Sequence, residues 1–143
     1  MQKNNYVYVF NTEYYYKDEN NDTHSFHIGY FSSNKKAREI IEKISDKPGF
    51  RDKNGEFIIS RERVYFDNPN FQKRDCVLFL LAHEFLDDDG YDNTTIWGPF
   101  ETRTEAEDVY LENKDKKPYC LYPDNFWVYD TKVDLYGWSE GFI

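Results

Sequence analysis

Four aspartates crowd into one short stretch, at positions 87, 88, 89 and 92, around Gly90 and Tyr91. Such a run could bind calcium, because hard cations prefer carboxylate oxygens. An EF-hand loop, however, needs acidic residues at its positions 1, 3 and 5, Gly at position 6 and Glu at position 12. With Gly90 at position 6, position 1 is Phe85 and position 12 is Ile96. The spacing therefore favours a solvated hairpin tip over a calcium site.

The three histidines offer no better chemistry. His24 and His27 are three residues apart in a predicted strand and would point to opposite faces of it. His83 precedes Glu84 and could form half of an acid–base pair, but a histidine in an apolar strand is more often structural. The chain has no Gly-x-Ser-x-Gly element, P-loop or Rossmann fingerprint. We therefore expect no catalytic residues, no metal site and no cofactor, and predict that the chain is not an enzyme.

The elements that would position these side chains begin with a hairpin. Residues 6–16 are rich in aromatic and β-branched residues, a polar turn follows, and residues 24–31 return. Ser32 or Ser33 can cap a helix over residues 34–44, which ends before Pro48-Gly49. Its predicted buried stripe is Ala37, Ile40, Ile41 and Ile44. A third strand is predicted over residues 57–66, with Ile58, Val64 and Phe66 on one face.

The second half of the chain predicts the same order of elements. The run from Cys76 to Ala82 is apolar on both faces and predicts a central strand that is covered on both sides. Residues 94–100 return from the acidic tip, and Thr102 and Glu105 form a capping box for a helix over residues 103–112. A last strand is predicted over residues 126–136. Its proposed inward face is Trp127, Tyr129, Val133 and Leu135.

A constant offset of 69 residues relates the two halves. At this offset Gly29 matches Gly98, Phe31 matches Phe100 and Ala37 matches Ala106, without a gap. We interpret the pattern as an internal duplication. The sequence thus predicts an α+β fold, a tandem duplication of a ββαβ unit over residues 1–69 and 70–143, with two helices packed on a mostly antiparallel sheet. Because units of about 70 residues are marginal as independent folders, we expect the repeats to share one core.

Charge separates the two halves. Residues 1–69 carry 11 basic and 11 acidic residues, whereas residues 70–143 carry 7 and 16, so the net charge of −9 belongs to the second half. Such a field attracts basic partners and repels nucleic acid and anionic lipid. The longest apolar run is too short to span a membrane, and residues 1–6 do not lead into a signal peptide. We therefore expect a cytoplasmic protein in which Cys76 and Cys120 are unpaired thiols.

The first half contains four linked sequence elements: Ile28-Gly-x-Phe-Ser-Ser-x-x-x-Ala37, then Ile40, Ile41 and Ile44, then Pro48-Gly-Phe-Arg-Asp52, and then Phe57-x-Ile59. With these elements it resembles a family of small bacterial domains of unknown function. In the second half the Pro-Gly-Phe-Arg-Asp element is replaced by Lys117-Pro-Tyr-Cys-Leu121. The resemblance implies a fold and no catalytic residues.

Two hypotheses for function follow from these observations. The first is a small acidic binding protein of the immunity, antitoxin or inhibitor type, which docks on and neutralises a basic protein such as a toxin or nuclease. The alternative is an enzyme or small-molecule binder with its site between the repeats. The first hypothesis excludes nucleic acid and membrane as partners, and leaves open whether the acidic residues form an interface or only a solvated face. Its candidate partner-binding residues are Asp87, Asp88, Asp89, Tyr91, Asp92, Glu101, Glu105 and Asp108.

Overall fold

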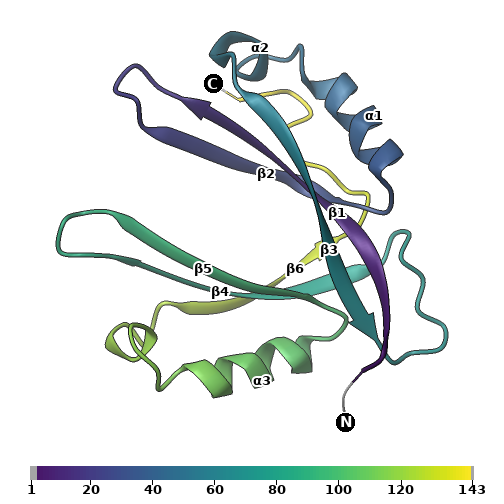
Figure 1. Ribbon diagram of the computed structural model, residues 1–143, viewed down its shortest axis with the longest axis vertical. Helices are drawn as coiled ribbons and strands as arrows, with labels where there is room; N and C mark the ends of the chain where they lie inside the picture. Colours follow the sequence, from purple (N-terminus) through teal and green to yellow (C-terminus); the bar gives the residue numbers. More distant parts are fainter. Residues whose placement is uncertain (1–2, 143) are drawn as a thin grey trace.

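The computed structural model describes residues 3–142 and has a mixed α+β fold, mostly strands (Figure 1). Each half contains two strands, a helix, a short helical turn and a third strand. The first half is β1 (Asn5–Lys17), β2 (Thr23–Phe31), α1 (Asn34–Ile44), α2 (Phe50–Lys53) and β3 (Glu56–Phe66). The second half is β4 (Val77–Leu86), β5 (Asp92–Phe100), α3 (Arg103–Asn113), the 3-10 turn η1 (Tyr119–Leu121) and β6 (Phe126–Lys132).

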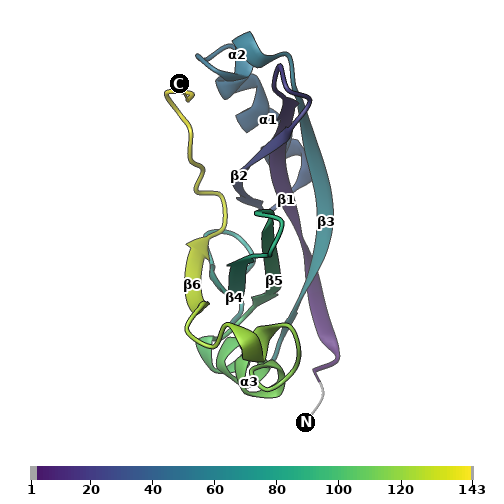
Figure 2. The same ribbon diagram turned by 90° about the vertical axis from the view of Figure 1, so that its left-hand side faces the viewer.

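The strands form two separate antiparallel sheets of three strands each, in the orders β2-β1-β3 and β5-β4-β6. Helix α1 packs on the first sheet and α3 on the second, at opposite ends of the molecule (Figures 1 and 2). The prediction of both helices on one sheet is therefore wrong. The reason lies in the pairing: the first strand of each half lies between the other two, so both of its edges are occupied within its own half.

Both long helices begin where their caps predict. The Ser33 hydroxyl accepts the Lys36 amide at 3.0 Å, and Thr102 and Glu105 complete a reciprocal capping box. On α1, Ala37, Ile40 and Ile44 are buried, whereas Ile41 is only half-buried. The helix therefore presents a narrower apolar stripe to the sheet than its sequence predicts.

Two clusters of buried side chains make up the core. The outer cluster fills the space between α1 and the first sheet, and comprises Tyr14, Ile28, Phe31, Ala37, Ile40, Ile44 and Phe50. The inter-sheet cluster draws on both halves, and comprises Val9, Tyr30, Val64, Leu78, Leu80 and Val133. The middle of the first sheet is thus covered on both faces, by α1 and by the second sheet.

The strand predictions hold better for central than for edge positions. Strand β4 is the central strand of its sheet, as its apolar run predicts. Ile58 lies on the same face of β3 as Val64, but it is 40% exposed while Val64 is fully buried. Strand β6 ends at Lys132, four residues earlier than predicted, because Asp134 adopts a left-handed conformation (φ 69°) that interrupts an extended strand.

After β6 the chain does not stay with the second sheet. Residues 133–142, which we call the C-terminal strap, run along the edge of β2 to the first half (Figure 2). The amides of Asp134 and Gly137 donate to the carbonyls of Tyr30 and Ile28, at 2.8 and 3.1 Å. At the end of the strap, the Phe142 ring packs among aromatic rings of the outer cluster, including Phe50 at 4.9 Å between centroids. The second half of the chain therefore completes the core of the first.

We predict that Ile40→Asp largely unfolds the protein. Ile40 is 1% exposed under α1, where an unpaired charge would lie in an apolar environment and cost more than about 4 kcal/mol. Glu42→Ala, on the exposed side of the same helix, should change the free energy of unfolding by less than about 0.5 kcal/mol. Urea denaturation followed by circular dichroism measures both, and equal shifts would contradict this orientation of α1.

We predict that Gly29→Ala detaches the strap from β2. A Cβ atom at position 29 would lie 2.7 Å from the Leu135 carbonyl oxygen, so the strap would have to move, at a cost of about 1–3 kcal/mol. Gly137→Ala is the matched control within the strap, because a Cβ atom there meets nothing within 4 Å. Urea denaturation gives both stabilities, and the Trp138 fluorescence reports the detachment. A Gly29→Ala protein as stable as the control would show that this approach is not needed.

Candidate functional site

One aspartate of the acidic hairpin tip, Asp87, stabilises the turn. Asp87 Oδ1 accepts the backbone amides of Asp89 and Tyr91, each at 3.0 Å, and Oδ2 accepts the Asn93 side-chain amide at 3.2 Å. The hydrogen bond from the Tyr91 amide, followed by that from Asn93, holds the pKa of Asp87 below its usual value. Asp87 therefore holds the turn, while Asp88, Asp89, Asp92 and the 71% exposed Tyr91 face solvent.

Two further predicted residues, Glu101 and Glu105, form ion pairs within the chain. Lys3 Nζ pairs with Glu101 Oε1 at 3.1 Å and with Glu105 Oε1 at 2.7 Å. Glu101 also accepts the backbone amides of Asp67 and Asn68, at 3.3 and 3.4 Å, and Glu105 completes the α3 capping box. These two carboxylates tie the N-terminal segment and the linker between the halves to the start of α3.

The structure does not bring the eight predicted residues together. The tip and the start of α3 lie at opposite ends of β5, whose nine residues span about 30 Å. Asp108 is exposed on α3. The predicted acidic patch is thus divided into two groups. Among residues 3–142, Glu101 and Glu105 are in ion pairs, whereas Asp108 and the aspartates of the hairpin tip are not.

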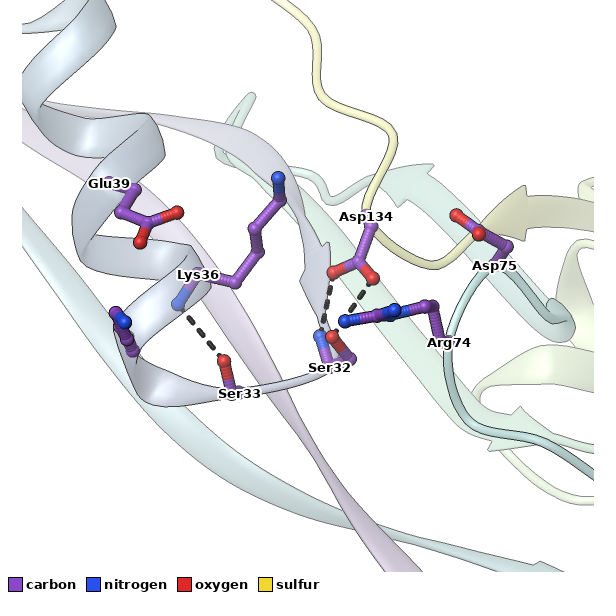
Figure 3. Close-up of a pocket in the computed structure, with 8 residues that line it drawn as sticks. Ser32, Ser33, Lys36, Glu39, Arg74, Asp75 and Asp134 are labelled. Carbon is purple, nitrogen blue, oxygen red and sulfur yellow. Dashed lines mark hydrogen bonds between the residues drawn. The ribbon is translucent and has the colours of Figure 1, made fainter.

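A pocket of about 440 Å³ lies where the strap meets the start of α1 (Figure 3). Asp134 accepts the Ser32 amide and hydroxyl at 2.8 and 2.9 Å, and Arg74 extends toward both residues. The charged groups that line the pocket balance in number: Lys35, Lys36 and Arg74 against Glu39, Asp75 and Asp134. The Asp134 bonds to Ser32 join the strap to the start of α1, so this side of the pocket serves as a contact between the halves.

A further group of polar side chains lies between the two sheets. This group was not identified from the sequence. Asn11 is 91% buried, and its Nδ2 lies 3.1 Å from Glu13 Oε1 and 3.5 Å from Glu62 Oε1. Tyr15 donates a hydrogen bond to Glu13, which raises the pKa of Tyr15 to about 12. Asn11 Oδ1 and Glu62 Oε2 are buried and have no hydrogen-bond partner within residues 3–142. We call Asn11, Glu13 and Glu62 the carboxylate cluster.

Burial dominates the electrostatics of this cluster. It raises the pKa of Glu62 above its usual value, and the nearby charge of Glu13 adds to the effect. Burial likewise raises the pKa values of Tyr30 and Tyr129, and the Glu62 charge contributes to both. Within residues 3–142 neither Glu13 nor Glu62 has a cationic partner within 4.0 Å. The neighbouring base is His27, which pairs with Glu13 across β1 and β2, but burial lowers the pKa of His27 although the Glu13 charge opposes this. Two carboxylates thus share a partly dry site without a permanent counter-charge.

Exposed apolar side chains lie on the facing surfaces of both sheets. Ile58 pairs with Glu13 across β1 and β3, and therefore shares its face. On the second sheet, Ile96 and Trp127 both pair with Ala82 of β4, on the face that carries Leu78 and Leu80. Ile58, Ile96 and Trp127 are 40%, 54% and 44% exposed. The hairpins β1–β2 and β4–β5 diverge toward their tips (Figure 1). We call these three residues the apolar flanks.

The remaining His and Cys side chains can be considered as possible metal or redox groups. Between residues 3 and 142 no group of three or more His, Cys, Asp or Glu side chains is arranged to hold a metal ion. Cys76 and Cys120 are free thiols, and burial raises the pKa of Cys76 to about 11. His83 is fully buried, with Nε2 3.0 Å from the Tyr122 carbonyl oxygen. Cys76 and His83 are thus side chains of the protein interior.

Comparison with known proteins adds no relative: no protein-family model, no curated protein and no solved structure matches the chain. The resemblance of the first half to a family of small bacterial domains stays a prediction. Among residues 3–142, no helix combines the length and apolar character needed to cross a bilayer.

We predict that Glu62→Gln stabilises the protein at neutral pH. Because burial raises the folded-state pKa of Glu62, its carboxyl favours folding when protonated and opposes it once pH rises through that pKa. The thermal midpoint of the variant should therefore exceed that of the wild type at pH 7.5, and the two should converge near pH 4. Exposed Glu84→Gln is the control, and should leave the midpoint unchanged at both values. A lower midpoint for Glu62→Gln at pH 7.5 would contradict an uncompensated charge.

Proposed function

We propose that the chain is a binding protein that docks on a basic protein partner through the faces that its two sheets turn toward each other. The observation that carries the proposal is the pair Glu13 and Glu62, half-buried carboxylates with no cationic partner within residues 3–142. A Lys or Arg side chain of a partner would supply the missing counter-charge in a site where water screens poorly. Asn11, whose Oδ1 has no partner within the same residues, offers a further acceptor.

The apolar flanks supply what charge alone does not. Interface energy concentrates in a few large side chains that lose water on binding, and Trp is among the most enriched of these. Trp127, Ile58 and Ile96 lie on the faces that the two sheets turn toward each other, so a partner that enters between the sheets to reach the carboxylates would also cover these side chains. Their exposure supports a protein partner, because a small cation would leave them uncovered.

The exposed hairpin tip has a separate part in this proposal. Asp88, Asp89 and Asp92 raise the negative potential of the second half without being buried. Charges of this kind speed the approach of a basic surface and make the association rate depend on salt, but add little to the final affinity. The proposed partner is a basic toxin or nuclease, which a protein of the immunity or antitoxin type neutralises by covering its cationic surface.

We also propose that the two halves are copies of one ββαβ unit. The offset of 69 residues supports it, because α1 (Asn34–Ile44) and α3 (Arg103–Asn113) differ by this number at both ends, as do β2 and β5. In this view the copies have diverged in charge, and the second became the acidic one.

A Lys- and Arg-rich peptide of about 12 residues, labelled with fluorescein, tests the proposal by fluorescence polarisation at low salt. The double variant Glu13→Gln and Glu62→Gln should weaken binding more than tenfold, because a buried charge pair is worth about 2–5 kcal/mol. The triple variant Asp88→Asn, Asp89→Asn and Asp92→Asn removes more charge, yet it should weaken binding less than threefold. Asp87 stays unchanged because it holds the turn.

The comparison of these variants distinguishes direct charge pairs with Glu13 and Glu62 from attraction by the net charge of the protein. If net charge alone caused binding, the triple variant would lose more affinity than the double variant. A larger loss for the triple variant would move the site to the hairpin tip. Wild-type protein that binds free lysine amide as tightly as the peptide would favour the small-molecule alternative.

A further inference from the structure

The face of the first sheet opposite the carboxylate cluster carries tyrosines and arginines. Strand register places Tyr6 beside Tyr65, Tyr8 beside Arg63 and Phe10 beside Arg61. These residues lie on the face that α1 covers. Phe10 packs against the outer cluster beneath α1, whereas Tyr6, Arg61, Arg63 and Tyr65 are exposed. We call five of them the Arg–Tyr ladder: Tyr6, Tyr8, Arg61, Arg63 and Tyr65.

Close contacts hold the two guanidinium groups of the ladder against aromatic rings. Arg61 Cζ lies 4.1 Å from the centroid of the Tyr8 ring, and Arg63 Cζ lies 4.6 Å from that of Tyr6. Arg63 Nη1 also lies within hydrogen-bond distance of the Tyr65 hydroxyl, at 3.3 Å. The rings thus limit the freedom of side chains that are otherwise mobile at a surface. Because most of their N–H groups have no partner within residues 3–142, both arginines can donate to an incoming oxyanion.

The surroundings of the ladder are also basic. Arg38 of α1 lies with Arg61 around a shallow hollow beside Phe10, and Lys73 Nζ lies 5.9 Å from the Phe10 ring centroid. Glu62 lies between Arg61 and Arg63 in the sequence, but strand alternation turns it to the other face. The β1 and β3 residues on the ladder face, from Tyr6 to Phe10 and from Phe57 to Tyr65, include no acidic residue. A net-neutral half therefore has a locally positive face.

We propose that the Arg–Tyr ladder binds single-stranded nucleic acid. Unpaired bases stack on exposed aromatic rings and on arginine planes, and the phosphates between them accept hydrogen bonds from guanidinium groups. Tyr6 and Tyr65 are 41% and 40% exposed. Arg61 and Arg63 are two residues apart on one strand, so their Cα atoms are spaced by about 7 Å along the face. Exposed aromatic rings on a sheet face are what RNA-recognition sheets use to stack bases, and here the two strands β1 and β3 supply that face.

The net charge of −9 led us to expect no nucleic-acid partner from the sequence, but it does not govern this face. At physiological ionic strength charges are screened over about 8 Å, which removes most second-half carboxylates from consideration. Glu101 and Glu105 do approach the Tyr65 end of the ladder, but both pair with Lys3, whose Nζ lies 3.5 Å from the Tyr65 carbonyl oxygen. An acidic peptide is the other anionic occupant to consider. A peptide usually binds in a groove or along an open strand edge, such as that of β1 before Phe10, where β2 does not pair with it. Binding along that edge would leave the rings of the ladder unused. The aromatic content of the ladder favours the nucleic acid.

Fluorescence polarisation with fluorescein-labelled dT12 and U12 oligonucleotides tests this assignment, with a duplex of equal length for comparison. We expect the wild-type protein to bind the single strands more tightly than the duplex at about 50 mM salt, with an affinity that falls as salt rises. The double variant Arg61→Gln and Arg63→Gln should lose about tenfold or more in affinity and reduce the salt slope by about two. Tyr65→Ala should weaken binding without changing that slope, because it removes stacking and leaves the phosphate contacts.

The matched control is Arg51→Gln with Arg103→Gln, which removes the same charge from exposed positions outside the ladder. It should keep most of the wild-type affinity. The proposal is overturned if neither oligonucleotide binds at low salt, if the control loses as much affinity as the ladder variant, or if a polyglutamate peptide binds the ladder while the oligonucleotides do not. Thermal midpoints of all variants should match that of the wild type, which separates lost binding from lost folding.

Discussion

The pairing of the C-terminal strap with the edge of β2 is the interaction on which the rest of the structure depends. The strap begins at Val133 in the inter-sheet cluster, bonds to β2 through the Asp134 and Gly137 amides, and ends with Phe142 among the rings of the outer cluster. It needs the close approach that Gly29 permits. Without the strap, the edge of β2 would expose backbone groups that water or another strand must satisfy. The two halves therefore depend on each other even though each completes its own sheet.

Strand alternation gives the first sheet two faces of opposite charge. Along β3, Arg61, Glu62 and Arg63 follow one another, and the pleat sends the glutamate to one side and the arginines to the other. The glutamate enters a partly dry space beside Tyr30 and Tyr129, where its charge is costly. The arginines lie on tyrosine rings in contact with water, where their positive charge costs little free energy. One sheet can thus present an acidic surface toward its neighbour and a basic one outward.

The acidic residues of the second half differ in what they do, although they look alike in the sequence. Asp87 is held by two backbone amides, and Glu101 and Glu105 are held by Lys3. These three side chains stabilise a turn, a linker and a helix start. Glu13 and Glu62 of the net-neutral half, in contrast, have no cationic partner within residues 3–142. Local partners, and not the total charge of a half, decide which carboxylates are available to another molecule.

Local features of the sequence account for the individual helices and strands. Cap residues, turn residues and apolar spacing act over a few positions, so both helix starts, the two hairpins and the central place of β4 could be predicted from them. Three features could be seen only in the folded chain: the sheets are separate, residues 133–142 leave the second half to cover β2, and Glu13, Glu62 and Asn11 meet between the sheets. Asn11 lies 51 positions from Glu62. Contacts of this range depend on which strand edges pair and which faces are covered, and the alternation of polar and apolar residues within one strand does not specify either.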